Sequence, residues 1–65
     1  MPLITIDIGP ITKEQKAELV KELVLKASEI CNVPEQAFLT IIKENSYDNV
    51  GNGTKLFSEI MKDKK

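Results

Sequence analysis

The shortness of the chain is its strongest constraint, because 65 residues contain nothing that could cross-link a small fold. A domain of this size buries only about 60% of the surface that its unfolded chain exposes. Small domains usually gain the missing stability from disulfides, a bound metal or association between subunits. Cys31 is the sole cysteine and histidine is absent, which excludes an internal disulfide and a Cys/His zinc site. We therefore expect one domain, residues 1–65, that oligomerisation completes.

The composition is that of a folded domain without affinity for polyanions. Hydrophobic residues make up 42% and charged residues 29% of the chain, which is typical of soluble globular domains. Nine basic and ten acidic residues give a net charge of −1, so we expect no nucleic-acid partner. There is no basic leader before an apolar run and no stretch of about 20 apolar residues, so we expect no membrane association and a cytoplasmic location.

The first predicted strand covers residues 3–8, where side-chain character alternates with the period of two that marks a strand. One face carries the three isoleucines that should point to the core: Ile4, Ile6 and Ile8. The other face carries Leu3, Thr5 and Asp7. Gly9-Pro10 should end the strand, because proline has no N–H to contribute to a ladder.

A helix is predicted to begin at Thr12, because Thr12 to Gln15 fits the capping-box pattern. Apolar residues then recur at steps of three and four, which predicts one buried stripe. The stripe consists of Ala17, Val20, Val24, Ala27 and Cys31, flanked by Leu23 and Ile30. Asn32-Val33-Pro34 should close the helix, since asparagine tolerates a left-handed cap and proline disfavours helical dihedrals before it. Cys31 is therefore expected to be a small core residue without a catalytic role.

A second strand is predicted at residues 37–44, whose β-branched centre suits a strand buried on most of both faces. A crossover that contains a full helix joins parallel strands, so the expected fold is α/β, a single β-α-β unit. Residues 45–53 should form a loop that reverses at Asn52-Gly53. Residues 54–65 have helical apolar spacing, although an extended arm packed on a neighbour would bury the same side chains. A short C-terminal hairpin or helical tail is thus expected.

Two parallel strands and one helix leave two bare strand edges and an uncovered sheet face. A two-fold partner would extend the sheet to four strands with two helices on one face. The opposite face, with Leu3, Thr5, Leu39 and Ile41, would then be free to bury against further dimers. We expect a symmetric homo-oligomer with a dimer as its building block.

Pro2 is the main candidate for chemistry, because histidine and the common catalytic motifs are missing. A small residue after Met1 favours removal of that methionine, which would leave a secondary amine at the start of a core strand. An α-amino group titrates at about 7.7–8.0, and apolar surroundings or a neighbouring cation lower its pKa. The neutral amine would then be a general base at neutral pH.

The whole pattern resembles the 4-oxalocrotonate tautomerase family. The features that carry the resemblance are the terminal Pro2-Leu3-Ile4, the Glu14-Gln15-Lys16 at the helix start, Ile41-Ile42-x-Glu44 and Val50-Gly51-x-Gly53. The resemblance implies β-α-β subunits that assemble into dimers and commonly into a hexamer. It also implies cofactor-free keto–enol isomerisation of a small carboxylate substrate such as 2-hydroxymuconate. Pro2 would move the proton in that reaction.

The family's best-known members hold the substrate with two arginines, and the positions that correspond to them differ here. The first falls at Pro10-Ile11 and the second at Leu39, while Val50 stands where those members have an aromatic residue. A cation that stabilises developing negative charge would have to come from elsewhere. Lys43 shares a strand face with Leu39, and Lys13 or Lys16 are further candidates, although all three also suit a solvated surface.

The predicted substrate-binding positions are therefore Leu39, Lys43 and Val50, and no metal or cofactor is expected. Tyr47 and Asn49 are ordinary loop residues that also have groups able to donate to an enolate. The leading hypothesis is an isomerase that uses Pro2. One alternative is an assembly protein that has kept the fold and lost activity, and another is a hydratase or dehalogenase that depends on the same proline.

Overall fold

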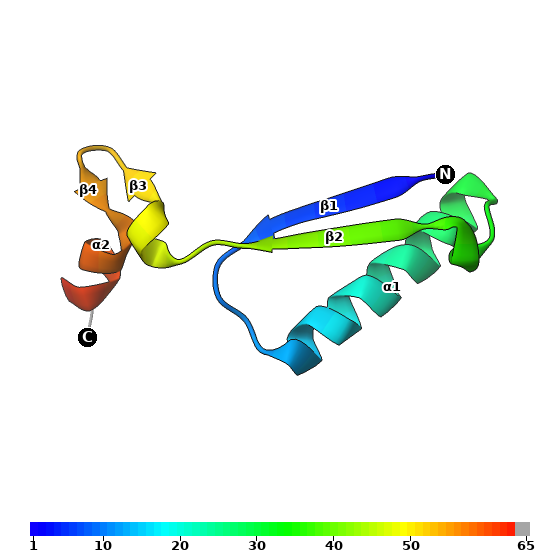
Figure 1. The fold of residues 1–65 in the computed structure, drawn as a ribbon, viewed down its shortest axis with the longest axis horizontal. Coiled ribbons are helices and arrows are strands. Elements are labelled where there is room, and N and C mark those ends of the chain that lie inside the picture. Colours follow the sequence, from blue (N-terminus) through cyan, green and yellow to red (C-terminus); the bar gives the residue numbers. More distant parts are fainter. Residues whose placement is uncertain (64–65) are drawn as a thin grey trace.

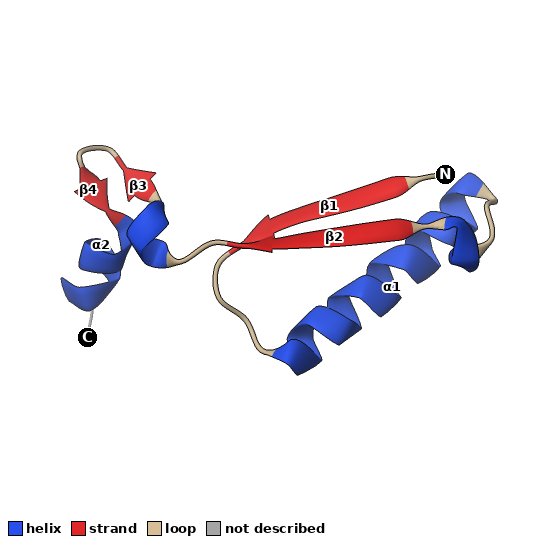
Figure 2. Ribbon diagram, in the orientation of Figure 1, coloured by secondary structure: helices blue, strands red, loops and turns tan. Residues whose placement is uncertain are grey.

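The structure is a computed structural model that describes residues 1–63, and it confirms the α/β class (Figures 1 and 2). The long elements are strand β1 (Leu3–Ile8), helix α1 (Lys13–Cys31) and strand β2 (Leu39–Glu44). The C-terminal elements are strands β3 (Gly51–Asn52) and β4 (Lys55–Leu56) and helix α2 (Phe57–Asp63). Single 3-10 turns lie at Glu35–Ala37 and Tyr47–Asn49. Among the described residues no helix is long and apolar enough to cross a membrane.

β1 and β2 pair in parallel, as predicted, with Leu3 opposite Leu39 and Ile8 opposite Glu44. β2 begins two residues later than expected. The Ala37 amide donates to the Pro34 carbonyl at 3.0 Å, which coils residues 35–37 into a 3-10 turn and keeps them out of the ladder.

Both predicted ends of α1 are confirmed. The Gln15 amide donates to the Thr12 hydroxyl at 3.1 Å, and the Thr12 amide donates to the Gln15 side chain at 2.9 Å, which completes the capping box. At the other end Asn32 is left-handed, with φ 57° and ψ 45°, and its amide donates to the Ser28 carbonyl.

The contacting stripe of α1 differs from the prediction at its two ends and at the flanking residues Leu23 and Ile30, which are both exposed. The half-buried members are Lys16, Leu19, Val20, Val24, Ala27 and Ser28. Ala17 is exposed because it lies at the side of this stripe. Cys31 is also exposed, so its assignment to the core was wrong in the single chain. A helix of 19 residues is about 28 Å long and a strand of six residues only about 20 Å, so the last helical residues extend past the sheet.

The sheet is covered on one face only. β2 was expected to be buried on most of both faces, yet exposed and half-buried residues alternate along β1 and along residues 39–43 of β2. No side chain of residues 1–62 is fully buried. We define the outer face as the side chains opposite α1: Leu3, Thr5, Asp7, Leu39, Ile41 and Lys43. Three large apolar members of this face, Leu3, Leu39 and Ile41, are 55%, 47% and 43% exposed. The core of a single copy is therefore incomplete.

The C-terminal unit, residues 46–63, projects from the end of the sheet (Figure 1). The expected chain reversal is present, with Gly53 at φ 65° between the paired residues Asn52 and Lys55. The tail proves to contain both a hairpin and a helix, and residues 64–65 of the predicted tail lie outside the described part. The chain extends over 45 × 22 × 15 Å, with a radius of gyration of 15.5 Å. A compact domain of this length would have a radius near 11 Å.

Candidate active site

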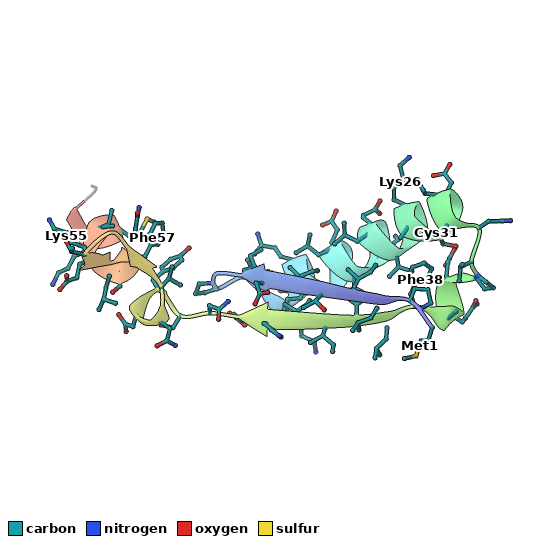
Figure 3. All side chains as sticks on the ribbon, turned by 90° about the horizontal axis from the view of Figure 1, so that it is seen from above. Met1, Lys26, Cys31, Phe38, Lys55 and Phe57 are labelled. Carbon is teal, nitrogen blue, oxygen red and sulfur yellow. The ribbon has the colours of Figure 1, made fainter. Side chains whose placement is uncertain are left out.

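Pro2 lies directly before β1 at the end of the sheet that also holds the turn preceding β2. Its carbonyl accepts a hydrogen bond from the Leu39 amide at 3.0 Å, which extends the ladder by one residue. Pro2 is half-buried, and Figure 3 shows Met1 and Phe38 at this same end. The strand pairing thus fixes the position of the Pro2 backbone.

Met1 is 90% exposed and precedes the Pro2 nitrogen. In the Met1–Pro2 peptide bond that nitrogen has its lone pair in amide resonance and carries no hydrogen. Removal of Met1 would convert it into a secondary amine that can accept and donate protons. The chemical competence of Pro2 therefore depends on cleavage of one exposed peptide bond.

Leu39 is the predicted site residue that the structure brings beside Pro2. Lys43 shares the outer face with Leu39 but lies four residues further along β2, a span of about 13 Å at the usual strand rise. The register places Asp7 opposite Lys43. Within one chain, Pro2 and Lys43 therefore do not meet at a single point.

Val50 lies between the turn Tyr47–Asn49 and β3, in the C-terminal unit. Figure 1 shows β3 beyond the end of the strands that is remote from the N-terminus. The Val50 carbonyl accepts from the Phe57 amide at 2.7 Å, which joins the turn to α2. It lines a crevice of about 240 Å³ with Asp7, Ile8, Gly9, Asn45, Tyr47 and Phe57. Within one chain Val50 and Pro2 therefore lie at opposite ends of the sheet. A Val50 near Pro2 would have to come from another copy of the chain.

Tyr47 has a packing role in this crevice. Its ring meets Phe57 edge-on, with centroids 5.2 Å apart and an interplanar angle of 64°. The ring also lies so close to Gly9 that an added Cβ there would stand 2.7 Å from Tyr47 Cε1. Tyr47 thus joins the C-terminal unit to the end of β1. Asn49 is exposed.

Glu44 makes two contacts that were not predicted from the sequence. Its carboxylate forms an ion pair with Lys16 at 2.5 Å and accepts from the Ile11 amide at 3.3 Å, so the end of β2 holds the loop before α1. The hydrogen bond from Lys16 is the main cause that lowers the pKa of Glu44; desolvation opposes it, and the charge of Lys16 and the hydrogen bond from the Ile11 amide lower the pKa further. The parallel register, which pairs Glu44 with the last residue of β1, would have indicated this contact.

The remaining lysine candidates lie at the surface, and Lys13 and Lys43 are both exposed. Lys16 already has a carboxylate partner in Glu44. Within residues 1–63 no three His, Cys, Asp or Glu side chains are grouped so that they could hold a metal ion.

A sequence model of the Tautomerase family, described as tautomerase enzyme, matches residues 2–60. No curated protein is significantly similar to the chain in sequence. Three solved structures are similar to it. The apo form of an unfused 4-OT is 27% identical with a TM-score of 0.82, over 91% of this chain and 98% of the other. A 4-oxalocrotonate tautomerase homologue is 28% identical with a TM-score of 0.83, over 91% of this chain and 95% of the other.

The third structure is a heterohexamer 4-oxalocrotonate tautomerase from Chloroflexus aurantiacus J-10-fl. It is 30% identical with a TM-score of 0.83, over 92% of this chain and 98% of the other. These likenesses extend over the β-α-β unit and most of the C-terminal unit. The family match and the shared architecture establish that the chain belongs to the 4-oxalocrotonate tautomerase family of the tautomerase superfamily.

Proposed function

We propose that the chain is a cofactor-independent keto–enol tautomerase in which the Pro2 amine, freed by loss of Met1, is the catalytic group. The observation that carries the proposal is the hydrogen bond from the Leu39 amide to the Pro2 carbonyl. A flexible terminus would have to be ordered in every catalytic cycle, whereas this one is held by the sheet. Membership of the tautomerase superfamily supports the reaction class.

The apolar setting of Pro2 favours the neutral amine that such a base requires. Leu3 and Leu39 flank it on the sheet, and Phe38 lies at the same end. Apolar neighbours disfavour the charged form of an amine relative to its neutral form. A larger neutral fraction at pH 7 raises the rate of proton abstraction.

The proposed reaction is an internal proton shift. The neutral amine accepts the proton of the enol oxygen while the C=O bond of the product forms. The resulting ammonium then donates a proton to the enol carbon, which restores the neutral amine. Atoms and charge balance without an oxidant, a reductant or a cofactor. The substrates are small 2-hydroxydienoate or 2-oxo acids, of which 2-hydroxymuconate is one.

We also propose that the working form is an oligomer of this chain. The exposed apolar side chains of the outer face and the absence of a fully buried side chain within residues 1–62 support association. The similarity to a heterohexamer tautomerase supports an assembly of several subunits. Lys43 and Val50 of one chain do not reach Pro2 of the same chain. In an oligomer, Lys43 or Val50 of a neighbouring copy would lie near Pro2 instead.

The decisive experiment begins with intact mass, which identifies the protein that has lost Met1. Ketonisation of 2-hydroxymuconate and phenylenolpyruvate is then followed by ultraviolet absorbance. We expect rates well above the buffer reaction, and a loss of about 10²-fold or more for Pro2→Ala, the usual contribution of a positioned base. Protein that retains Met1 is the matched control and should be inactive until methionine aminopeptidase has acted on it.

Equal turnover by Pro2→Ala and the parent protein would exclude the mechanism. An inactive protein with a free Pro2 and an intact oligomer would favour the alternative, an assembly protein of the same fold. The missing arginines at Pro10-Ile11 and Leu39 give that alternative its support.

A further inference from the structure

The tip of the hairpin formed by β3 and β4 carries an asparagine followed by a glycine, Asn52 and Gly53, and both are exposed. Gly53 has φ 65°, and apart from its neighbours in the chain no atom lies within 4 Å of the place that a Cβ would occupy. The turn and loop hydrogen bonds within residues 1–63 include none from the Gly53 amide. Figure 1 shows the tip pointing away from the β-α-β unit. The Gly53 nitrogen is therefore open to attack chemistry and to water.

This openness is relevant because asparagine is chemically labile in proteins. The side-chain carbonyl carbon of an asparagine and the peptide nitrogen of the next residue can close a five-membered ring. A Cβ on the next residue hinders their approach, and glycine has none. A hydrogen bond from that nitrogen opposes the reaction too, since the nitrogen has to lose its proton. A glycine with a free amide after the asparagine is therefore the most reactive arrangement.

The other three asparagines of the chain lack this combination. Asn32 and Asn49 each precede a valine, whose branched side chain crowds the nitrogen. The amides of both valines also donate to a main-chain carbonyl a few residues earlier. Asn45 is half-buried, and its side-chain amide donates to the Lys43 carbonyl at 3.3 Å. Asn52 thus differs from all three in its local structure.

We propose that Asn52 is a site of non-enzymatic deamidation and of main-chain isomerisation. The Gly53 nitrogen attacks Asn52 Cγ, so that a bond forms between them. The side-chain nitrogen leaves as ammonia with the proton of the Gly53 amide. Water then opens the cyclic imide at either of its two carbonyl carbons. Opening at Cγ gives aspartate, and opening at the main-chain carbonyl gives an isoaspartyl linkage through Cβ and Cγ.

Water is the sole co-reactant, and no other molecule has to bind. The modification needs neither a substrate nor a free Pro2 amine, so it does not depend on the proposed activity. Its success or failure leaves the proposed function untouched.

The two products should affect the C-terminal unit differently. Asn52 pairs with Lys55 in a hairpin of two residue pairs, and so short a hairpin is marginally stable. The isoaspartyl linkage adds one carbon to the main chain at this pair and disturbs its geometry. The hairpin leads into the hydrogen bond from the Phe57 amide to the Val50 carbonyl, so this junction with α2 should loosen. Aspartate keeps the main chain and places a carboxylate opposite Lys55, which favours the pair.

The test incubates the full-length protein in mildly alkaline water enriched in heavy oxygen. Trypsin digestion in ordinary water follows, so that heavy oxygen marks changes made in the intact protein. Residues 44–55 form one tryptic peptide, in which fragment masses separate three of the asparagines: Asn45, Asn49 and Asn52. We expect most molecules to gain heavy oxygen at residue 52 before it enters any other asparagine. Asn52→Gln, whose longer side chain would have to close a larger ring, is the matched control and should stay unlabelled there.

The same peptide, released before the incubation, serves as the reference without a fold. If the peptide reacts at Asn52 while the folded protein stays unlabelled, the hairpin or a neighbouring copy protects the site and the inference is overturned. Labelling of Asn45 or Asn49 as fast as Asn52 in the folded protein would overturn it as well, because Gly53 would then confer no reactivity.

The isoaspartyl product has its own readouts. Protein isoaspartyl methyltransferase with S-adenosylmethionine should transfer a methyl group to the incubated wild-type protein and not to Asn52→Gln. Hydrogen exchange of the Phe57 amide should be faster in the methyl-accepting protein than in fresh protein, whereas Asn52→Asp should show no increase. Deamidated protein that accepts no methyl group would exclude the isomerisation. An unchanged Phe57 exchange rate would exclude the loosening.

Discussion

The contact of Tyr47 with Gly9 predicts that Gly9→Ala destabilises the protein when the Tyr47 ring is present and stabilises it when the ring is removed. A Cβ added at Gly9 would stand 2.7 Å from Tyr47 Cε1, 3.1 Å from the hydroxyl and 3.2 Å from Cζ. Ordinary contacts begin near 3.4 Å, so the ring would have to move by about 0.7 Å. Phe57 packs on the same ring, with centroids 5.2 Å apart, so a movement of the ring would also disturb that contact.

Two opposing effects set the magnitude for Gly9→Ala. Overpacking of this kind costs about 1–3 kcal/mol. Replacement of glycine by alanine also restricts the unfolded chain, which stabilises the fold by about 0.4–1 kcal/mol where the backbone tolerates alanine. Gly9 is not among the residues with positive φ, so that condition holds. The expected net effect is a loss of about 0.5–2 kcal/mol.

In a Tyr47→Ala background the steric cost disappears and only the effect on the unfolded chain remains. Gly9→Ala should then stabilise the protein by up to about 1 kcal/mol. The four proteins of this double-mutant cycle are compared by thermal unfolding at one fixed protein concentration, because association shifts the midpoint. For a domain of this size, 1 kcal/mol corresponds to about 4–8 °C.

The reasoning would be refuted if Gly9→Ala lowered the midpoint equally with and without the Tyr47 ring. Stabilisation in both backgrounds would be as damaging, because it would mean that the C-terminal unit does not rest on Gly9. Ser46→Ala, on the same 3-10 turn but remote from the ring contact, is a control. It removes the hydroxyl that accepts from the Asp48 amide and should not change the sign for Gly9→Ala.

Three further predictions concern the helix cap, the ion pair and the outer face. Thr12→Ala removes the hydroxyl that accepts from the Gln15 amide and should cost about 1 kcal/mol in denaturant unfolding, whereas Thr12→Ser should cost little. The pKa of Glu44 is lower in the folded state than in the unfolded state. Its ion pair therefore stabilises the protein fully at pH values above the ordinary pKa of a glutamate, about 4.3. This stabilisation is lost as the pH falls from there through the lowered pKa. The wild-type advantage over Glu44→Gln should therefore be present at pH 7 and shrink at pH 3–4, measured as unfolding free energy across pH; an advantage that grew in acid would contradict the assignment. Ile41→Asp should dissociate the oligomer in sedimentation velocity while Ile30→Asp does not, since Ile41 lies on the outer face and Ile30 on α1; an intact Ile41→Asp oligomer would argue against burial of that face.

Local signals in the sequence predicted the elements well because each has a short-range cause. The capping box at Thr12, the left-handed cap at Asn32 and the alternation of residues 3–8 all reappear in the structure. Parallel pairing followed from the length of the crossover, and the register with Leu3 opposite Leu39 agrees with it. These features depend on neighbours in the chain or on connection length.

Predictions that needed the relative lengths and positions of elements were less successful. Cys31 fits the helical stripe by its spacing, but whether a strand lies beneath the last turn depends on how long the strands are. The late start of β2 depends on a turn that Pro34 initiates. Glu44 gave no recognisable pattern because its partners, Lys16 and Ile11, lie 28 and 33 residues away in the chain.

In the candidate site, too, what depends on local sequence was predicted and what depends on the arrangement of distant elements was not. Pro2 was predicted from chemistry, and the structure adds the bond to Leu39 that holds it. Val50 was predicted from the resemblance and Lys43 from the strand face that it shares with Leu39, and neither argument indicated how far these residues lie from Pro2 within one copy. Their roles stay predictions, because they depend on how neighbouring copies approach one another.

The one-sided sheet has a consequence for how the protein behaves on dilution. Where association supplies part of the core, folding and assembly form one equilibrium and follow mass action. For a dimeric step, each tenfold dilution would remove about 1.4 kcal/mol from the apparent stability. The abundance of the polypeptide would then help to decide whether it is folded. A freshly made copy would also present two open strand edges until it met a partner, and the rate of that encounter would set the time during which it is prone to aggregate.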